Sequence, residues 1–350
     1  MKAILLSCTE KPITAAHVGH FRKMISTLGV GGIIGSHYIL HSKTQLLQIL
    51  DAEQPDIVFS AAYYTPGDAD ELTNIHKILE EMDIPYIGSD SDTLELVLSK
   101  AKLKDRWKSD GVPTPNYFQI RRSGTSVCGL DRMLGVNGFP YILKPDREGN
   151  SRGLSEDSIV FDQKSLELKL SCLLDQYDEV LVERYLGTNF DIREFTVAMI
   201  GNGNQMLLMP AEIVLLRERK IRIITTQDKE RSFTRATPVY DHDLNEQLIQ
   251  LAGQAFRVAG VRDYSRCDVI YANGQFYAIE INGQPIVPDK WFDACARGVG
   301  LDRLQYVNAI FLAGIIRNIE QGKANLIIPL EMKQILPKSI LDVLLKPVNV

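Results

Sequence analysis

Four polar residues near the carboxyl end of the chain have the chemistry of a cation site: Arg266, Asp268, Glu280 and Asn282. They lie within or next to two apolar-rich runs, 267–271 and 275–281, which flank Ala272-Asn273-Gly274 in a pattern typical of a β-hairpin. Hard divalent cations take oxygen ligands, and Mg²⁺ combines a few protein oxygens with phosphates and waters. Two carboxylates and an amide oxygen beside a guanidinium therefore indicate a Mg²⁺ site. The alternative is an exposed polar face of a hairpin.

The turn decides whether these side chains can act together. A two-residue Asn273-Gly274 loop would pair Asp268 with Ile279 and put Glu280 on the opposite face. A three-residue loop, with its glycine in the left-handed conformation, pairs Arg266 with Glu280 and leaves all four polar side chains on one face. We predict the three-residue loop.

A second stretch has the composition of a phosphate-binding loop. Lys144 ends the strand-like sequence YILK, and the loop Asp146–Gly153 follows it with two glycines, an asparagine and a serine. Successive backbone N–H groups in such a loop can hold an anion, and a lysine adds a point charge. A plain surface turn has the same composition, so both interpretations stay open. The loop is not of the Walker A type, because no GKS or GKT follows.

Other charged residues have weaker cases. Lys100, Lys102 and Lys104 are expected on a solvated helix face, and only Lys100 has a more specific interpretation, given below. Glu183 ends the strand-like sequence EVLVE. Such a strand end can line a nucleotide pocket, and a capped strand end is the alternative.

The composition limits the class of protein. A chain of 350 residues is expected to form two or three domains. Its net charge of −5 gives no electrostatic footprint for nucleic acid, and no apolar run is long enough to span a bilayer. The amino terminus turns polar too soon for a signal peptide. The five cysteines are dispersed, which suits a reducing cytoplasm.

The elements that must position these residues follow from the hydrophobic pattern. Strand and helix signals alternate over residues 1–90, which predicts an open α/β domain, with a helix at Asp68–Met82. The run GVGGIIG at Gly29–Gly35 follows a helix and leads into a strand, so it does not fit a dinucleotide fingerprint. Next, Ser91–Asp110 is predicted as one helix, capped by Asp92 or Ser91.

Two further domains are expected, over residues 91–184 and 185–330, with a carboxyl-terminal extension at 331–350. The central one has strand signals at Tyr117–Ile120, Pro140–Lys144, Ser158–Phe161 and Glu179–Glu183, and a helix after Gln163. The third has strand signals at Arg193–Ile200, Gln205–Leu216 and Lys220–Thr226, a helix at Asp243–Ala259, and the hairpin. The extension contains a predicted helix, Lys338–Leu345.

Several segments together resemble the D-alanine–D-alanine ligases, members of the ATP-grasp superfamily. They are ELVLSKAKLKDRWKSDGVPTP, YILKPDREGNSRGLS, EVLVERYL with REFTV, and SRCDVIYANGQFYAIEIN, in the order and rough spacing of that family. The resemblance covers residues 84–285 well and the first domain loosely. It implies an α/β (α+β) ATP-grasp fold, in which an open α/β domain precedes two α+β subdomains that clasp the nucleotide.

The resemblance also implies residue roles. Two Mg²⁺ ions, which Mn²⁺ could replace, would be held by Asp268, Glu280 and Asn282. Arg266 matches the arginine that stabilises the tetrahedral intermediate, and Lys229 matches a mobile-loop lysine that reaches the transferred phosphate. ATP would be bound by phosphate-contacting lysines, the glycine-rich loop, an adenine hinge and a ribose glutamate: Lys100, Lys144, Glu148, Gly149, Asn150, Ser151, Glu183, Arg184, Tyr185, Leu186 and Glu194.

The family chemistry runs in two steps. A substrate carboxylate attacks the γ-phosphorus of ATP to give an acyl phosphate and ADP, and an amine then attacks the acyl carbon and displaces phosphate. Phosphoryl transfer needs charge neutralisation and in-line positioning, which the ions and lysines would supply. Arg266 would serve the oxyanion of the second step, a type of contribution commonly worth about 3 kcal/mol. Because acyl phosphates hydrolyse, we expect a covering loop, at Ile213–Ser232.

Departures from the family fall at the amino-acid pockets. Asn150 replaces a serine, Asn282 is followed by Gly283-Gln284-Pro285-Ile286-Val287 in place of a segment ending Pro-Gly-Met-Thr, and Glu10 is at best a displaced counterpart of an amino-terminal glutamate. The stretch between Leu186 and Glu194 is also longer than usual. Glu10, Asn150, Gly283 and Gln284 are therefore the candidate substrate residues, in pockets that differ from those for D-alanine.

We therefore expect a cytoplasmic, ADP-forming ligase that joins amino acids, or an amino acid and another amine. The alternatives are a D-alanine–D-alanine ligase of peptidoglycan synthesis and a catalytically silent ATP-binding scaffold. The expected partners are small molecules, a carboxylate and an amine, with no nucleic acid and no membrane. A homodimer is a candidate assembly.

Overall fold

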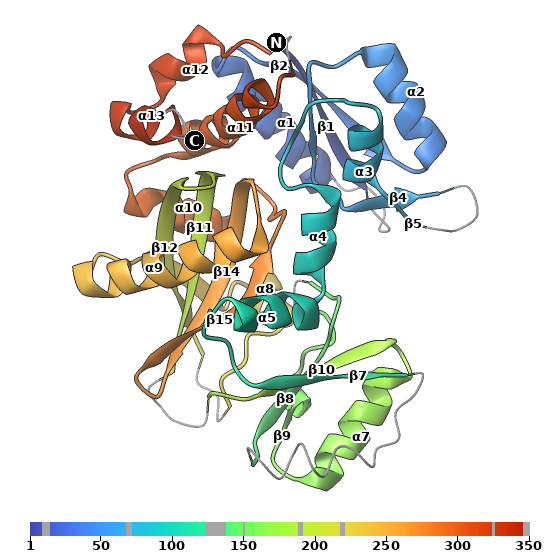
Figure 1. Cartoon of the computed structure of the whole chain (residues 1–350), viewed down its shortest axis with the longest axis vertical. Coiled ribbons are helices and arrows are strands. Elements are labelled where there is room, and N and C mark those ends of the chain that lie inside the picture. The colour runs from blue at the N-terminus through green and yellow to red at the C-terminus, as the bar shows by residue number, and fades with distance from the viewer. Residues whose placement is uncertain are drawn as a thin grey trace.

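A computed structural model of the chain describes residues 1–8, 15–67, 72–122, 138–149, 151–187, 192–217, 221–323 and 326–345. Two four-stranded sheets and one five-stranded sheet organise this part of the chain (Figure 1). The first sheet lies at one end of the molecule and the second at the other, with the five-stranded sheet between them in the view of Figure 1.

The amino-terminal sheet is parallel, with the strand order β2-β1-β3-β6. Strands and helices alternate along the chain, which confirms the predicted open α/β arrangement. The elements are β1 (Lys2–Cys8), α1 (Ala15–Val30), β2 (Ile34–Leu40), α2 (Lys43–Glu53), β3 (Ile57–Ser60), α3 (Ile75–Glu81) and β6 (Tyr86–Ile87). The run Gly29–Gly35 joins the end of α1 to the start of β2, whereas a dinucleotide-binding loop joins a strand to a helix.

The predicted helix Asp68–Met82 is wrong at its start. A small hairpin of β4 (Tyr64–Pro66) and β5 (Leu72–Asn74) occupies the beginning of this stretch, and residues 68–71 lie outside the described part. The Asn74 side chain accepts a hydrogen bond from the Lys77 backbone N–H at 3.2 Å, so it caps the helix and fixes its first residue.

The helix predicted at Ser91–Asp110 is two helices, α4 (Ser91–Leu98) and α5 (Lys100–Ser109), which run in different directions in Figure 1. Asp90, not Asp92 or Ser91, caps α4. The break is at Ser99, whose backbone is extended (φ −85°, ψ 106°) and whose hydroxyl donates to Asp146 Oδ2 at 2.6 Å. This long-range hydrogen bond ties the break to the glycine-rich loop and places Lys100 in the first turn of α5.

The central sheet is antiparallel, with the strand order β7-β10-β8-β9. Its elements are β7 (Tyr117–Arg121), β8 (Tyr141–Pro145), the short 3₁₀ helix η2 (Glu156–Ser158), β9 (Ile159–Val160), α7 (Gln163–Leu174) and β10 (Glu179–Arg184). Helix α7 packs on this sheet around a core of its own that includes Leu143, Leu166 and Val182. The four predicted strands and the helix are confirmed.

The third sheet is antiparallel, with the strand order β13-β12-β11-β14-β15. Its strands are β11 (Arg193–Asn202), β12 (Gln205–Leu215), β13 (Thr234–Pro238), β14 (Asp263–Ala272) and β15 (Gln275–Asn282). Helix α9 (His242–Ala259) packs on the sheet in one core, and α10 (Lys290–Gly298) and α11 (Arg303–Glu320) pack on it in another. The predicted strand Lys220–Thr226 is wrong, because residues 221–225 form no strand and α8 (Thr226–Glu230) follows.

The β14–β15 hairpin has the two-residue turn, so the predicted three-residue loop is wrong. Asn273 (φ 52°) and Gly274 (φ 77°) are both left-handed, as a type I′ turn requires. A register shift at Asp268/Val269 then inserts one extra residue, Ile279, on β15. As a result Asp268 pairs with Glu280, and the predicted common face of the polar residues is confirmed by a different route.

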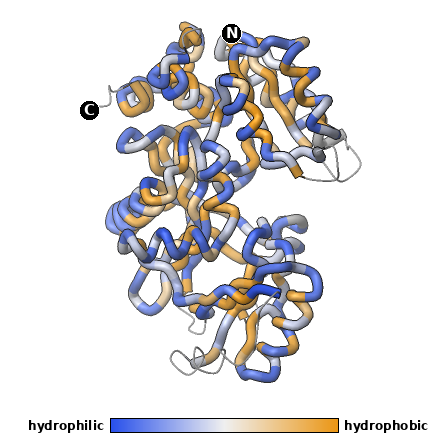
Figure 2. The backbone as a smooth tube through the Cα atoms, turned by 45° about the vertical axis from the view of Figure 1, so that its right-hand side comes forward, coloured by the Kyte–Doolittle hydropathy of each residue, from blue (hydrophilic) through white to orange (hydrophobic). Residues whose placement is uncertain are grey.

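The largest core joins the amino-terminal sheet to the five-stranded sheet. It contains Ala3 and Phe59 of the amino-terminal sheet, Ile200 of the five-stranded sheet, and the buried face of α11, including Phe311. Helices α12 (Leu330–Ile335) and α13 (Lys338–Leu344) pack against the same core, and α13 confirms the helix predicted in the extension. Figure 2 shows hydrophobic segments gathered in the strands and hydrophilic ones on the outer turns of the helices. The domain boundaries stay a prediction.

Within the described residues, no single helix is long and apolar enough to cross a membrane. Helices α10 and α11 reach the required length and apolar content only as a pair, which is bent by 90° at its break.

Candidate active site

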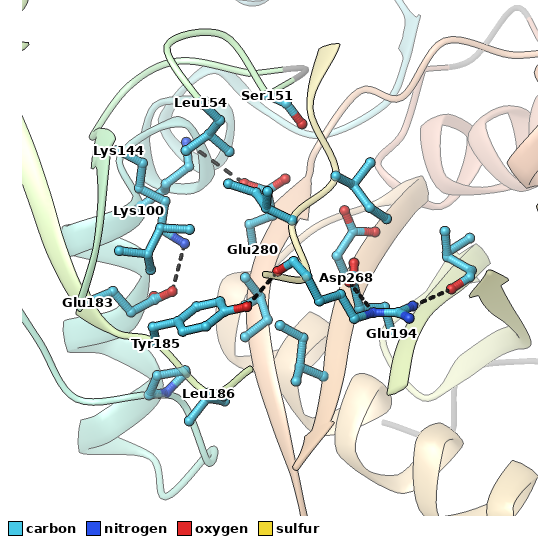
Figure 3. Close-up of a pocket in the computed structure, with 18 of the residues that line it drawn as sticks. Lys100, Lys144, Ser151, Leu154, Glu183, Tyr185, Leu186, Glu194, Asp268 and Glu280 are labelled. Carbon is cyan, nitrogen blue, oxygen red and sulfur yellow. Dashed lines mark hydrogen bonds and ion pairs between the residues drawn. The ribbon is translucent and has the colours of Figure 1, made fainter. Parts of the chain in front are cut away.

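A pocket lies between the central sheet and the five-stranded sheet. Its lining includes Lys144 of β8, Glu183 of β10, Glu194 of β11, Asp268 of β14 and Glu280 of β15 (Figure 3). Most of the predicted nucleotide and metal residues share it, namely Lys100, Lys144, Glu148, Ser151, Glu183, Arg184, Tyr185, Leu186, Glu194, Lys229, Asp268 and Glu280. The pocket lining does not include Gly149, Arg266, Asn282, Gly283 or Gln284. Glu10 and Asn150 lie outside the described residues.

The two carboxylates of the hairpin lie directly across from each other. Asp268 accepts a hydrogen bond from Thr196 Oγ1 at 2.7 Å, and the side chains of Asp268 and Glu280 remain 24% and 27% exposed to the pocket. Burial raises the pKa of Asp268, and the charge of Glu280 adds to this rise against the opposing effect of Arg266. Burial would also raise the pKa of Glu280, but the surrounding lysines outweigh it and lower the pKa.

Two predicted phosphate lysines reach the pocket from different elements. Lys100 donates to the carbonyl oxygens of Asp146, at 3.2 Å, and Glu148, and its Nζ lies 3.8 Å from Glu280 Oε2. Burial lowers the pKa of Lys100. Lys144 forms an ion pair with Glu183 at 2.7 Å. The break before α5 and the end of β8 thus bring both ammonium groups to the glycine-rich loop.

Lys104 lies behind the pocket wall, next to Glu183, and was not predicted as a site residue. It was expected on a solvated face but is fully buried, whereas its neighbour Lys102 is exposed. Its Nζ lies 2.7 Å from Glu183 Oε2 and 2.7 Å from Thr114 Oγ1. Burial lowers its pKa to about 8, although Glu183 opposes the shift. The available signal was its spacing of four residues from Lys100, which puts both on one helix face.

Glu183 is therefore a buried carboxylate between two lysines. Burial would raise its pKa, but Lys104 and Lys144 together lower it. The chain continues from Glu183 into Arg184, Tyr185 and Leu186, which line the same end of the pocket. This end combines a charged acceptor with apolar and aromatic surface, as a nucleobase site does.

Residues of the predicted covering loop do lie along the pocket. Arg222, Ile223, Ile224 and Lys229 contribute to the lining, and Ile213 at the start of the predicted range belongs to β12. We call residues 221–232 the covering segment. Ile223 packs with Ile159 and Tyr185, Thr226 Oγ1 donates to the Ser151 carbonyl at 3.1 Å, and Lys290 Nζ donates to the Lys229 carbonyl at 3.2 Å.

The sheet and the covering segment share an ion pair at the pocket wall. Arg222 Nε donates to Glu194 Oε1 at 2.8 Å, and Arg222 Nη2 donates to the Ile213 carbonyl at 3.0 Å. Burial raises the pKa of Glu194, and the guanidinium of Arg222 opposes the rise. Arg222 was not among the predicted site residues, because only the fold brings residue 222 to strand β11.

Arg266 and Lys229 meet at one aromatic ring. The Arg266 guanidinium carbon lies 4.8 Å from the ring centre of Trp291, and Lys229 Nζ lies 5.2 Å from it. Trp291 lines the pocket, is 6% exposed, and has a buried Nε1 without a hydrogen-bond partner. Asp289 Oδ2 accepts from Arg266 Nη1 at 3.3 Å. Trp291, near the start of α10, was also not among the predicted site residues.

The segment after β15 is docked on the amino-terminal domain. A Cβ atom on Gly283 would lie 2.6 Å from Val97 Cγ2 and 3.1 Å from Leu94 Cδ2, so this position is closed to larger residues. Gln284 is buried, and its amide donates to the Ser60 carbonyl and lies 3.1 Å from His76 Nε2. These contacts hold the end of β15, and Asn282 with it, against α4.

Comparisons with known proteins bear on the same region. The family model described as D-ala D-ala ligase C-terminus matches residues 106–309. The D-alanine–D-alanine ligase of Xanthomonas axonopodis pv. citri (strain 306) is 30% identical over 264 residues, which cover 73% of this chain and 77% of that protein. The D-alanine–D-alanine ligase of Carboxydothermus hydrogenoformans is 26% identical over 281 residues, which cover 77% of this chain and 85% of that protein.

Solved structures share the fold. The D-alanine–D-alanine ligase of Bacillus anthracis complexed with ATP superposes with a TM-score of 0.71 at 19% identity, covering 92% of this chain and 100% of that one. The D-alanine–D-alanine ligase of Coxiella burnetii gives a TM-score of 0.66 at 17% identity, covering 92% of this chain and 98% of that one. The predicted ATP-grasp fold is therefore confirmed. Because the matched range also holds the central sheet, the covering segment and the β14–β15 hairpin, the chain belongs to the D-alanine–D-alanine ligase family of ADP-forming carbon–nitrogen ligases.

Proposed function

We propose that this chain uses ATP to activate a small carboxylate, such as an amino acid, and joins it to an amine through an acyl phosphate. The observation that carries the proposal is the register of the hairpin, which pairs Asp268 with Glu280 and Arg266 with Asn282. An oxyanion-binding guanidinium beside a carboxylate pair, at a pocket with several lysines, suits phosphoryl transfer followed by attack at a carbonyl.

The donor set at the hairpin fits Mg²⁺. Asp268 and Glu280 repel each other as directly opposed carboxylates, and a divalent cation bound between them would remove that repulsion. Asn282 adds an amide at the next position on the same face, so two carboxylates and one amide oxygen would hold the metal. A bound Mg²⁺ would neutralise phosphate charge and position the phosphoryl group.

The lysines divide the remaining work along the nucleotide. Lys100 and Lys144 flank the glycine-rich loop and would bind phosphate oxygens there. Lys229, carried by the covering segment, would approach the transferred phosphoryl group from the other side. Burial lowers the pKa of Lys229, so the approach of phosphate would favour its protonated form. Glu183 and the residues after it would bind the base.

The second step requires stabilisation of an oxyanion at the acyl carbon. Arg266 is held by Asp289 and by the face of Trp291, and Asp268 and Asp289 keep its pKa raised in spite of burial. A fixed guanidinium would bind the developing charge without reorganisation, which is the basis of oxyanion-type catalysis. The covering segment would exclude water that would otherwise hydrolyse the acyl phosphate.

The amino-acid pockets support a substrate other than D-alanine. Gln284 is anchored to the amino-terminal domain, and the bulky Trp291 contacts both Lys229 and Arg266 at the pocket. The names of the sequence relatives favour D-alanine–D-alanine ligation as the second candidate. The dispersed cysteines support a cytoplasmic location.

An ADP-release screen over pairs of amino acids and other amines, with mass spectrometry of the products, tests the proposal. We expect ADP and an amide product with at least one pair, and phosphate release with the activated acid alone. ATP binding without ADP release over the whole panel would favour the silent scaffold. Turnover confined to D-alanine would establish the second candidate.

A further inference from the structure

The ammonium group of Lys229 rests against an aromatic ring at the pocket. Its Nζ lies 5.2 Å from the ring centre of Trp291, and within the described part of the chain it forms no hydrogen bond and no ion pair. Burial lowers the pKa of Lys229, and the charges of Glu280 and Asp268 oppose this shift. The ammonium therefore lies near the two opposed carboxylates of the hairpin, on the side of the pocket where phosphates would be bound.

Trp291 belongs to a firmly packed element. It lies in the first turn of α10, and the next residue, Phe292, is buried in the largest core. Asp289 caps this helix by accepting from the Phe292 backbone N–H at 2.6 Å, and its other carboxylate oxygen accepts from Arg266 at 3.3 Å. The Arg266 guanidinium in turn lies 4.8 Å from the ring centre of Trp291. The helix cap and the guanidinium therefore fix the indole ring relative to the five-stranded sheet.

The same turn of α10 also holds the backbone of the covering segment. Lys290, the residue before Trp291, donates from Nζ to the Lys229 carbonyl at 3.2 Å. Two neighbouring residues of one helix thus contact the same lysine, one at its backbone and the other at its ammonium group. A lysine has a long and flexible side chain, so these contacts limit the positions that the Lys229 ammonium can take.

An aromatic ring holds a cation in a different way from a carboxylate. A carboxylate neutralises an ammonium group and occupies its N–H donors, whereas a ring attracts the cation through its quadrupole. The charge and the three N–H donors of Lys229 therefore remain for a phosphate. Because the ring already restricts the side chain, a phosphate that binds Lys229 incurs less of the entropy cost of ordering it.

We propose that Trp291 is a positioning residue, whose ring holds the Lys229 ammonium in place for the terminal phosphate of ATP. This inference rests on the proposed use of ATP. The ring supplies no charge to the phosphate. It restricts the positions of Lys229, and Arg266 keeps the ring itself in place. Loss of the ring therefore acts through Lys229, and it affects ATP, which has the terminal phosphate, more than ADP, which lacks it.

Calorimetric titration with ATP and with ADP, each in the presence of Mg²⁺, tests the inference without knowledge of the acid or amine. We expect the wild type to bind ATP more tightly than ADP. Trp291→Leu should reduce this preference by about 5- to 30-fold, the range for loss of a desolvated cation–π contact. Trp291→Phe keeps an aromatic ring and should retain most of the preference. Lys229→Met should also reduce it, and the double variant with Trp291→Leu should lose no more than Lys229→Met alone.

Phe292→Leu is the matched control. It removes an aromatic ring from the same turn of α10, but Phe292 is buried in the core and does not line the pocket. It should change the affinities for ATP and ADP by one common factor. The inference is overturned if the wild type binds ATP and ADP equally, if Trp291→Leu weakens both by the same factor, or if the effects of Trp291→Leu and Lys229→Met add. Failure of the wild type to bind either nucleotide would instead overturn the proposed function.

Discussion

Glu183 illustrates how single side chains set the charge of the pocket. It accepts from Lys144 and forms an ion pair with Lys104, and each contact is 2.7 Å long. Two buried cations share one anion here, and the position therefore retains positive charge that phosphates could use. Loss of either lysine would leave Glu183 with one cationic partner and one carboxylate oxygen without its hydrogen bond.

Replacement of Lys104 should destabilise the fold and change its pH dependence. We expect Lys104→Met to lower the free energy of unfolding by about 1–3 kcal/mol, the range for leaving buried hydrogen-bond partners unsatisfied, here Thr114 Oγ1 and Glu183 Oε2. Burial lowers the pKa of Lys104 to about 8 in the folded state, so above this pH the unfolded chain binds more protons at this lysine than the folded chain does. The Lys104 contribution to stability therefore rises with pH between about 8 and 10.

Urea denaturation at several pH values, compared between wild type and Lys104→Met, measures both effects. The exposed Lys102→Met is the control and should change neither. A difference between wild type and Lys104→Met that stays constant from pH 8 to 10 would contradict the assigned pKa.

Glu280→Gln tests the metal site most directly. It keeps the shape of the side chain but removes one of the two opposed carboxylates, so Mg²⁺ binding should fail. We expect ADP formation to fall by at least about 100-fold, because loss of a residue that only supports a metal ligand already costs about 10- to 100-fold. The circular dichroism spectrum should not change. Glu246→Gln, on the exposed face of α9, is the control. Near-normal turnover in Glu280→Gln would remove this residue from the site.

Some site residues could be predicted from the sequence and others could not. Strand alternation with a three-residue turn predicted Asp268 and Glu280 on one face, whereas the structure reaches this arrangement through a two-residue turn and the bulge at Ile279, which the sequence did not reveal. Lys104 was missed because its burial results from contacts with Thr114 and Glu183, which are distant in sequence. Arg222 and Trp291 were missed for the same reason, since each reaches the pocket only through tertiary packing.

At the level of elements, local sequence signals predicted most strands and helices but not where several of them stop. Ser99 divides α4 from α5 because its hydroxyl bonds to Asp146, a partner 47 residues away. The predicted strand at Lys220–Thr226 is instead part of the covering segment, whose short helix α8 begins with a capping box of Thr225 and Asp228. The contact at Ser99 is outside any local window, whereas the capping box joins residues only three positions apart.

The packing of the segment after β15 can be tested by adding one methyl group at Gly283. In Gly283→Ala the new Cβ would lie 2.6 Å from Val97 Cγ2, so α4 or the strand end must move. We expect a loss of about 1–3 kcal/mol in unfolding free energy, the usual cost of overpacking, and slower ADP release because Asn282 shifts. Gly29→Ala is the control, since nothing lies within 4 Å of its Cβ. Equal stability of the two variants in urea would show that the junction is loosely packed.

At the scale of the whole molecule, a buried ion pair connects the amino-terminal sheet to the five-stranded sheet. Arg317 of α11 binds Asp263 of β14 at 2.7 Å, and Asp263 also accepts from the Gly88 backbone N–H at 2.7 Å. Arg317 donates further to the Tyr86 carbonyl at 2.7 Å. One arginine thus satisfies groups from both sheets.

Asp263→Asn should weaken this connection strongly. It leaves the Arg317 guanidinium buried without a countercharge, and we expect a loss of about 3–5 kcal/mol in unfolding free energy. Asp83→Asn, which removes an exposed ion pair with Lys323, is the control and should have little effect in the same denaturation experiment. Similar melting temperatures for the two variants would contradict the structural role of Asp263.

The separate core of the central sheet has a mechanical consequence. The amino-terminal and five-stranded sheets share one hydrophobic core through α11. The core of α7 and its sheet is separate, and this body is joined to the rest through a small cluster of Ile159, Tyr185 and Ile223 and through the Lys104–Glu183 ion pair. A change in the distance between the two bodies would therefore disturb this small cluster and leave the shared core intact. We therefore expect the central sheet and α7 to move as one body relative to the rest of the molecule, with the extended backbone at Ser99 as the hinge.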